Sequence, residues 1–342
     1  MKFRKIGALL LVIVTAAGFL GCSSNKNSDD NKVRVGFFPN ITHAQALIGK
    51  NQGKFQKLLG DKYPIEWKQF NAGPAEIEAL LAGELDIAYV GPGPAVNGYA
   101  RSKGEIQIIS GASDAGAVLI ARKDAGIKEV KDLQGKKVAI PQFGNTQDLS
   151  LRALLKENGL KDKTKDGNVE IVRAENPDIK TLLDQNRIDA ALVPEPWGAR
   201  LEKEVGARVV LDYNEVWRQG QYSTAVIVAR SDFIKSHPEV VENFLKAHVD
   251  ITDYINESKE ASKNVVNDEI GKLTKKPLEK SVLNSSFKRI TSTNNPEKQS
   301  IEEMTDLSVG VGFLRERPDL KNLFNLDILN KVLKEKGKQE IK

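Results

Sequence analysis

The strongest constraint on the fold is a regular alternation of short β-rich runs with helical patterns between residues 33 and 230. The β-rich runs predict strands at 33–38, 65–70, 86–90, 106–112, 117–121, 137–140, 169–174, 190–193, 207–211 and 224–229. Helical patterns that stop at a glycine lie between them, as at 75–83 and 149–159. Such alternation predicts parallel sheets of the α/β class. From residue 232 to residue 338 the pattern becomes almost wholly helical.

The two halves of this alternating region echo each other at a spacing of 103 residues. Each half ends with a helix that begins at proline, a strand of pattern x-Asp-x-Ala-x-Val and a proline-rich turn. The matching residues include Val35 and Val138, Pro74 and Pro177, Leu80 and Leu183, and Val90 and Val193. One interpretation is two α/β lobes of one design that face each other across a cleft. The other is a chance similarity between two βαβ units.

The N-terminus has the pattern of an export signal. Three basic residues precede an apolar run at 6–20, which is shorter than the roughly 20 residues that span a bilayer. The run ends at Gly21-Cys22, and Cys22 is the only cysteine in the chain. This arrangement resembles a bacterial lipoprotein signal, whereas the alternative is an ordinary secretory signal with a chance cysteine. We expect a signal peptide at 1–21, and a lipidated Cys22 with a polar tether at 22–32.

Charge argues against a nucleic-acid partner. The chain carries 51 basic and 46 acidic residues, a net charge of +5. Loss of the signal peptide removes three of the basic residues, so the mature protein is nearly neutral and lacks the charge excess that nucleic acids attract. A single cysteine also excludes a disulfide framework and a multi-cysteine metal site. We expect neither a metal nor a cofactor.

The turns that follow the predicted strands contain the candidate ligand site, because open α/β sheets bind ligands beyond the carboxyl ends of their strands. These turns are 39–43, 71–74, 91–94, 141–147 and 194–198. Two of them lead into helices that begin near Thr42 and Thr146, where free N–H groups attract an anion. The alternative is that each threonine only caps its own helix. The turns contain no lysine or arginine, which suits a weakly hydrated monoanion such as a sulfonate or nitrate.

The sequence allows two interpretations for each of two side chains in the last turn, Glu195 and Trp197. Glu195 would repel an anion, so it either contacts an amine elsewhere on the ligand or points into solvent. Trp197 either forms an apolar wall for an alkyl group or anchors the core where a helix opens after Pro196.

Four stretches carry a resemblance to ABC-transporter substrate-binding lipoproteins of the nitrate/sulfonate/taurine family. They are 70–99, 117–140, 187–201 and 222–248, and the resemblance extends over nearly all of 33–330. Within this family the chain is most similar to aliphatic-sulfonate-binding proteins. The resemblance implies a two-lobed, periplasmic-binding-protein-like α/β fold of type II, with the ligand in the interlobe cleft and a helical C-terminal part. It places lobe 1 at 33–115 plus 224–342 and lobe 2 at 116–223, with crossings near Ala115-Gly116 and Ser223-Thr224.

The resemblance also implies a set of ligand-binding residues. Mapped onto this chain, the family's ligand turns give Asn40, Thr42, His43, Gly73, Pro74, Gly91, Pro92, Gln142, Asn145, Thr146, Gln147, Glu195 and Trp197. Sulfonate binders often have adjacent serines and a histidine in the second-lobe turn, where this chain has 144–147 (GNTQ), so the ligand stays open. An aliphatic sulfonate or taurine is the expected ligand. Nitrate, bicarbonate and a pyrimidine precursor of thiamine are the alternatives.

The implied partners are the permease subunits of an ABC importer, and the implied protein is a monomer tied by its lipid to the outer face of the bacterial cell membrane. The rival class is an enzyme, including the pyrimidine-precursor-synthase-like branch. Hydrolysis needs a nucleophile with a base, or a metal with several ligands. Only His43 lies near the expected cleft, and Asp86 and Asp189 each start a strand on the far side. We therefore expect no enzyme activity. A surface interaction protein without a small ligand has no positive support in the sequence.

Overall fold

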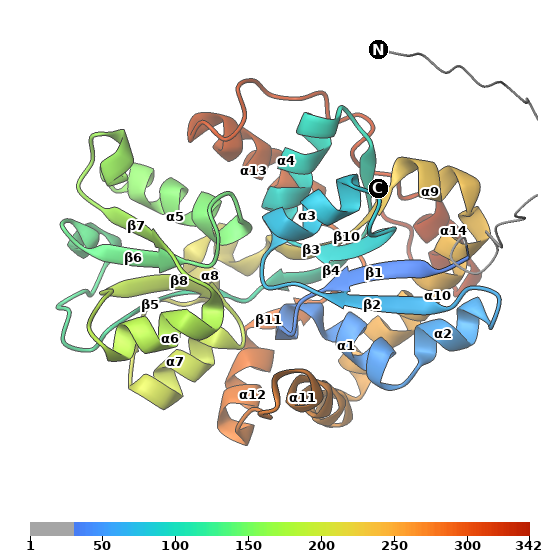
Figure 1. Cartoon of the computed structure of the whole chain (residues 1–342), viewed down its shortest axis with the longest axis horizontal. Coiled ribbons are helices and arrows are strands. Elements are labelled where there is room, and N and C mark those ends of the chain that lie inside the picture. Colours follow the sequence, from blue (N-terminus) through green and yellow to red (C-terminus); the bar gives the residue numbers. More distant parts are fainter. Residues whose placement is uncertain (1–30) are drawn as a thin grey trace, which may run out of the picture.

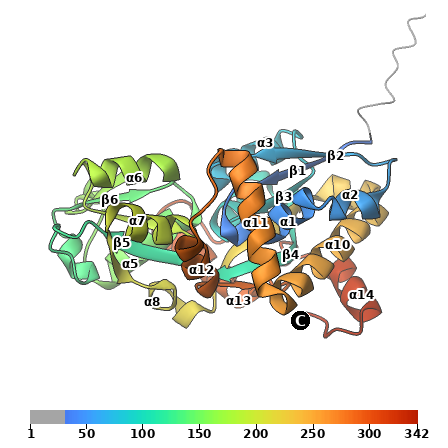
Figure 2. The ribbon, with the colours of Figure 1, turned by 90° about the horizontal axis from the view of Figure 1, so that it is seen from below.

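The computed structural model describes residues 31–342, which form two α/β lobes lying side by side (Figures 1 and 2). The predicted signal peptide, Cys22 and nearly all of the predicted tether lie outside these residues. Each lobe is built around one sheet, and the chain passes from the first sheet to the second between β4 (Ile106–Ala115) and β5 (Ala117–Ala121). It returns to the first sheet at β10 (Ser223–Arg230).

The first sheet has the strand order β11-β4-β10-β3-β1-β2. Its other strands are β1 (Val33–Phe37), β2 (Ile65–Gln69), β3 (Ile87–Val90) and β11 (Ile290–Ser292). Its helices are α1 (Ala44–Asn51), α2 (Lys54–Leu59), α3 (Gly73–Leu81), α4 (Pro92–Ser102), α9 (Ser231–Ser236), α10 (Pro238–Glu257), α11 (Lys259–Thr274), α12 (Lys280–Lys288), α13 (Lys298–Gly310) and α14 (Asp327–Glu335). A 3₁₀ turn, η1 (Ile41–His43), precedes α1.

The second sheet has the strand order β7-β6-β8-β5-β9. Its remaining strands are β6 (Lys137–Ile140), β7 (Glu170–Arg173), β8 (Ala190–Pro194) and β9 (Arg208–Leu211). Its helices are α5 (Thr146–Glu157), α6 (Asn176–Asp184), α7 (Trp197–Val205) and α8 (Tyr213–Val216), with short 3₁₀ turns η2 (Val130–Leu133), η3 (Lys163–Lys165) and η4 (Arg218–Gly220).

Helices cover both faces of each sheet, which explains why the central strands are continuously apolar. Alternate residues of β10 enter two different cores, with Ile227 on the side of α1 and α10 and Val228 on the side of α3 and α4. The second sheet repeats this arrangement, since Leu119 of β5 packs with α5 and Ile120 packs with α6 and α7. Each lobe is therefore a three-layer α/β/α unit.

The two sheets share one topology and one register. The order β2-β1-β3-β10-β4 corresponds to β7-β6-β8-β5-β9, and the parallel and antiparallel pairs match position by position. Val35 lies opposite Ile87 and Val138 lies opposite Ala190, so both partners are displaced by the same 103 residues. The echo in the sequence is a repeat of three-dimensional structure rather than a chance similarity.

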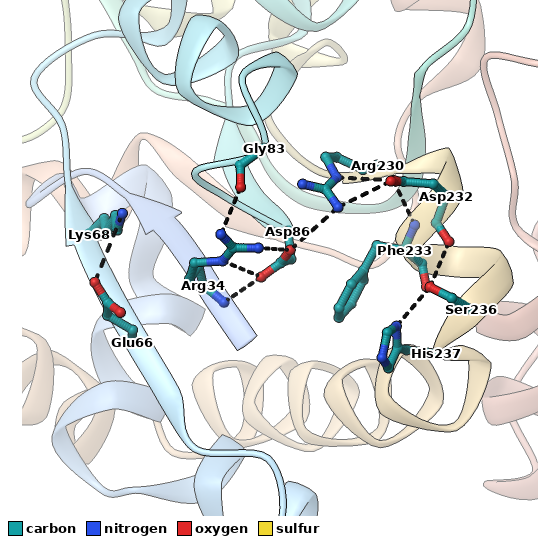
Figure 3. Close-up of polar contacts among 10 residues, drawn as sticks. All are labelled: Arg34, Glu66, Lys68, Gly83, Asp86, Arg230, Asp232, Phe233, Ser236 and His237. Atoms are coloured by element: carbon teal, nitrogen blue, oxygen red, sulfur yellow. Dashed lines mark hydrogen bonds and ion pairs between the residues drawn. The ribbon is translucent and has the colours of Figure 1, made fainter. Parts of the chain in front are cut away.

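An aspartate just before the central strand fixes the register of each sheet. Asp86 Oδ2 accepts hydrogen bonds from Arg34, from the backbone N at 2.8 Å and from Nε at 3.0 Å (Figure 3). In the second sheet, Asp189 Oδ2 accepts from the backbone N of Lys137 at 2.9 Å, and Asp189 Oδ1 accepts from Arg122 Nη2 at 3.1 Å. Both carboxylates lie at the amino ends of the central strands, on the far side from the expected cleft, as the sequence predicted.

All ten strands predicted from the sequence are present, with ends that differ by at most a few residues. The prediction missed β11, which pairs with the end of β4 and interrupts the region expected to be helical. Along the part of the chain that the structure describes, no helix combines the length and the apolar character needed to cross a membrane.

One buried carboxyl gives the fold a testable pH dependence. Glu76 of α3 is fully buried, and neither of its oxygens has a hydrogen-bond partner within residues 31–342. It packs so closely on Gly36 of β1 that a Cβ there would lie 2.3 Å from Glu76 Oε1. Burial raises the pKa of Glu76 well above 4.5, so the group stays protonated in the folded chain.

We expect Glu76→Gln to stabilise the protein increasingly as the pH rises. In the unfolded chain Glu76 ionises above about pH 4.5, so the wild-type free energy of unfolding loses up to about 1.4 kcal/mol for each pH unit from there until the folded pKa is reached. The neutral amide lacks this penalty. Urea unfolding at pH 4, 6 and 8 measures the difference, with the exposed Glu78→Gln as control. A difference that does not grow with pH contradicts the prediction.

Candidate ligand-binding cavity

A small cavity of about 30 Å³ lies between the lobes, at the carboxyl ends of the strands of both sheets. The first lobe contributes Phe38, Asn40, Thr42, His43, Asn71, Ala72, Gly73, Gly91, Pro94 and Thr224. The second lobe contributes Pro141, Asn145, Thr146, Gln147, Asn176 and Pro194. Among these residues of the described chain no side chain is an acid, a lysine or an arginine.

The lining repeats the internal symmetry of the fold. The spacing of 103 residues that relates the two sheets also relates residues on opposite walls: Phe38 and Pro141, Thr42 and Asn145, His43 and Thr146, Gly73 and Asn176, Gly91 and Pro194. The cavity therefore lies where equivalent turns of the two lobes meet.

Helix N-termini surround the cavity. α3, α5 and α6 begin with the lining residues Gly73, Thr146 and Asn176, and α4 begins immediately after Gly91. The first N–H groups of a helix have no partner within the helix, and the helix dipole favours negative charge there. Each helix end contributes about 0.3–1 kcal/mol to holding an anion, and more where the site is partly buried. Helix ends from both lobes thus offer donors to one small volume.

Neither threonine caps its own helix, so the capping alternative does not hold. The cap of α5 is Asn145, whose Oδ1 accepts from the backbone N of Asp148 at 2.8 Å. Thr146 Oγ1 instead accepts from the backbone N of Gly93 in the other lobe at 3.3 Å. Thr42 lies within η1, which has no side-chain cap. Both hydroxyl groups belong to residues that line the cavity.

His43 is a neutral hydrogen-bond donor. Its Nδ1 accepts from the backbone N of Phe38 at 3.2 Å, and its ring stacks on the Phe38 ring with centroids 4.4 Å apart. Burial lowers the pKa of His43 to about 3. The ring is therefore uncharged at physiological pH, and the bond to Nδ1 places its single proton on Nε2. His43 can donate one hydrogen bond to an anion but brings no positive charge.

Amide side chains complete the wall. Asn40 Oδ1 accepts from the indole Nε1 of Trp197 across the lobes at 3.0 Å, so Nδ2 is the group that Asn40 can donate. Gln147 Oε1 accepts from Asn145 Nδ2 at 3.1 Å, which likewise leaves its Nε2 as donor. Both amides are therefore oriented as donors.

The walls of the two lobes touch beside the cavity. A Cβ added to Gly91 would lie 2.3 Å from Thr146 Oγ1, and one added to Gly93 would lie 2.7 Å from Leu149 Cδ1. Only residues without a side chain fit at these two positions. At the rim, Asn71 Nδ2 donates to Glu175 Oε2 across the lobes at 2.9 Å.

Glu195 has a role that the sequence analysis did not predict. Its carboxylate neither lines the cavity nor points into solvent; it is fully buried behind the cavity wall. Glu195 Oε1 accepts from Arg289 Nη1 at 2.9 Å, and Oε2 accepts from Ser286 Oγ at 2.8 Å and from the backbone N of Ala199 at 3.2 Å. Burial raises the pKa of Glu195, while Arg289 and the hydrogen bonds oppose that shift. The expected contact with a ligand amine is thus replaced by an ion pair between the lobes.

Four other expected residues also lie outside the lining. Trp197 is the first residue of α7 and packs in a core of the second lobe. It therefore anchors that core and does not form an apolar wall for the ligand. Pro74 lines a larger groove of about 790 Å³, which α3 and α4 form together with Phe143 and Gly144 of the second lobe and with residues 313–319. Pro92 and Gln142 are not among the lining residues. The expected residues that do line the cavity are Asn40, Thr42, His43, Gly73, Gly91, Asn145, Thr146 and Gln147.

The sequence analysis missed several lining residues, and the internal repeat could have found some of them. Asn176 lies 103 residues after Gly73, Pro141 lies 103 after Phe38, and Pro194 lies 103 after Gly91. No comparable signal pointed to Thr224, whose hydroxyl donates to the backbone O of Ala115 where the chain crosses between sheets.

Comparison with known proteins places the chain in a family. Residues 26–268 match the NMT1-like family. The chain is 33% identical to the taurine-binding periplasmic protein of Escherichia coli, over 60% of this chain and 61% of that protein. It is 25% identical to a Bacillus subtilis protein named for binding aliphatic sulfonates, over 95% of this chain and 97% of that protein.

Solved structures show the same fold. The alkanesulfonate-binding protein SsuA from Xanthomonas axonopodis pv. citri, bound to MOPS, superposes with a TM-score of 0.71 at 15% identity, covering 84% of this chain and 96% of that one. The two-lobed α/β architecture is thus that of periplasmic solute-binding proteins. The chain belongs to the NMT1-like family.

Proposed function

We propose that the protein captures a small organic anion, an aliphatic sulfonate or taurine, and delivers it to an ABC importer. The observation that carries this proposal is the interlobe cavity, where helix N-termini and neutral donors from both lobes converge on one small volume. The names of the relatives support the choice of sulfonate. Binding rather than catalysis is favoured because His43 is the only titratable side chain among the described lining residues, and its Nδ1 already accepts a backbone hydrogen bond.

The donor set suits a sulfonate chemically. A sulfonate stays ionised near neutrality and has three oxygens that only accept hydrogen bonds. Micromolar affinity requires about 8 kcal/mol. Hydrogen bonds to a charged group contribute about 1.5–3 kcal/mol each, so a few donors and two or three helix ends reach this value after the cost of immobilising the ligand.

We also propose that the lobes, 33–115 plus 224–342 and 116–223, open and close about the two crossings between the sheets. Ala115 and Gly116 both have positive φ angles, of 61° and 79°. The returning strand is bonded to the same point, since Ala115 N donates to the backbone O of Tyr222 at 2.9 Å. A cavity of about 30 Å³ holds no more than a few water molecules, so an alkylsulfonate enters only when the lobes separate.

The membrane attachment is a further part of the proposal. Cys22 would carry the lipid, and the polar residues 23–32 would link it to β1. Each buried CH₂ of an acyl chain contributes about 0.8 kcal/mol, so two chains or more hold a protein durably at a bilayer. The permease subunits would then receive ligand from a binding protein held at the membrane surface.

We expect the protein comprising residues 23–342 to gain thermal stability with taurine or ethanesulfonate. Ligand at a hundred times its dissociation constant adds about 2.7 kcal/mol to the free energy of unfolding. Differential scanning fluorimetry across sulfonates, nitrate, bicarbonate and a pyrimidine tests this expectation. Thr42→Ala and Thr146→Ala should weaken binding without unfolding the protein. No response to any ligand would overturn the proposal, and a response to nitrate or the pyrimidine alone would change the ligand class.

Gly91→Ala should prevent the lobes from closing on the ligand. The φ of Gly91 is −68°, which alanine adopts freely, but its Cβ would lie 2.3 Å from Thr146 Oγ1. Overpacking of this kind costs about 1–3 kcal/mol, equivalent to a loss of affinity of about five- to 150-fold. Isothermal titration calorimetry measures the loss. Gly310→Ala, where the added Cβ has ordinary contacts, is the control. Unchanged affinity in Gly91→Ala would contradict the closed arrangement of the two walls.

Cys22→Ser should release the protein from the membrane. Without the thiol no acyl chain can be attached, so labelled palmitate is not incorporated and the protein appears in the soluble extracytoplasmic fraction of a bacterial host. Ser23→Ala serves as a control that keeps the cysteine. Retention of Cys22→Ser at the membrane would show that the attachment does not depend on this residue.

A further inference from the structure

Among the equivalent residues of the cavity, one pair differs by a whole side-chain amide. Gly73 and Asn176 are equivalent residues, each the first of its helix and each followed by proline. Both line the cavity. Gly73 brings no side chain to the wall, whereas Asn176 brings an amide. The second lobe therefore adds a polar group where the first lobe has none.

The Asn176 side chain is a buried acceptor without a donor. The residue is 5% exposed, and no donor within residues 31–342 reaches its Oδ1. An unpaired buried acceptor is costly, and native proteins keep few of them. An acceptor of this kind at the wall of a ligand cavity indicates that the ligand supplies the missing donor.

The chemistry of a simple alkanesulfonate does not satisfy this acceptor. Sulfonate oxygens only accept hydrogen bonds, and an alkyl chain offers no donor. A ligand with an ammonium or hydroxyl group at its other end does. The dipole of α6, which begins at Asn176, opposes an ammonium at this position, but the adjacent Glu175 carboxylate offsets that dipole and favours the ammonium. Glu175 is held at the rim by its hydrogen bond from the lining residue Asn71.

We propose that Asn176 is a specificity-determining residue that accepts a hydrogen bond from an N–H or O–H group of the ligand. This inference rests on the proposed function, and it narrows the ligand to sulfonates that carry a donor, with an aminoalkanesulfonate preferred. The donors of His43, Asn40 and Gln147 would hold the sulfonate. Asn176 would hold the opposite end.

Three ligands of nearly equal shape test the proposal: taurine with a terminal ammonium, isethionate with a hydroxyl, and propane-1-sulfonate with a methyl group. Titration calorimetry on the protein comprising residues 23–342 should give the affinity order taurine, isethionate, propane-1-sulfonate. We expect at least about a tenfold difference between the first and the last, because a hydrogen bond involving a charged group is lost. Equal affinities, or tighter propane-1-sulfonate, would overturn the proposal.

Two variants separate the acceptor role from other roles. Asn176→Ala should weaken taurine about tenfold and leave propane-1-sulfonate within about twofold. Asn176→Asp keeps an acceptor and adds a negative charge, so it should retain taurine, whose ammonium compensates that charge, and weaken propane-1-sulfonate, which has no positive group. If Asn176→Asp instead loses taurine and propane-1-sulfonate alike, the amide donates to the sulfonate and the proposal is wrong. Equal weakening of taurine and propane-1-sulfonate by Asn176→Ala would also overturn the proposal.

The control is Asn168→Ala, because Asn168 lies in the same lobe, also has an unpaired buried Oδ1 among the described residues, and does not line the cavity. It should leave all three affinities unchanged; a change equal to that of Asn176→Ala would overturn the assignment. Failure of the wild-type protein to bind any of the three sulfonates would defeat the proposed function itself. Binding of all three with equal strength would defeat only the role of Asn176.

Discussion

One guanidinium group holds the two lobes in the arrangement that creates the cavity. Arg289 follows α12 of the first lobe, and its Nη1 contacts Glu195 Oε1 at 2.9 Å and Glu202 Oε2 at 2.7 Å. Its Nε contacts Asp212 Oδ1 at 2.7 Å. All three acids belong to the second lobe. Removing one member of a buried ion pair typically costs about 3–5 kcal/mol, because the remaining charge is left without a partner.

The same contact solves an electrostatic problem for an anion site. Glu195 directly follows Pro194, which lines the cavity, so an uncompensated carboxylate would repel a bound anion through a medium of low dielectric constant. The Arg289 guanidinium cancels that charge from behind the wall. The cavity can then hold an anion with neutral donors alone. Glu195 and Arg289 both lie outside its lining.

The fold could be predicted from the sequence to a large extent because its signals are local. Each β-rich run and each helical pattern that ends at a glycine can be recognised within a short stretch, and comparing such stretches reveals the repeat at 103 residues. The structure confirms the ten predicted strands and the repeat. β11 was missed because a three-residue strand depends on pairing with β4, far away in the sequence. The Glu195 ion pair was missed for the same reason, since its partner Arg289 lies 94 residues later, directly after α12. Burial and charge compensation are properties of the assembled lobes.

The repeat explains both what the cavity shares and where it differs between lobes. Equivalent turns bring helix N-termini to both walls, which suits a ligand group with several equivalent oxygens. The side chains are under no such constraint: His43 occupies the position equivalent to Thr146, and Gly73 occupies the position equivalent to Asn176. A ligand with two different ends can therefore bind in only one orientation. Because the two orientations differ in hydrogen bonds to buried groups, the free-energy difference between them is large, and a nearly symmetric fold becomes a site for an asymmetric ligand.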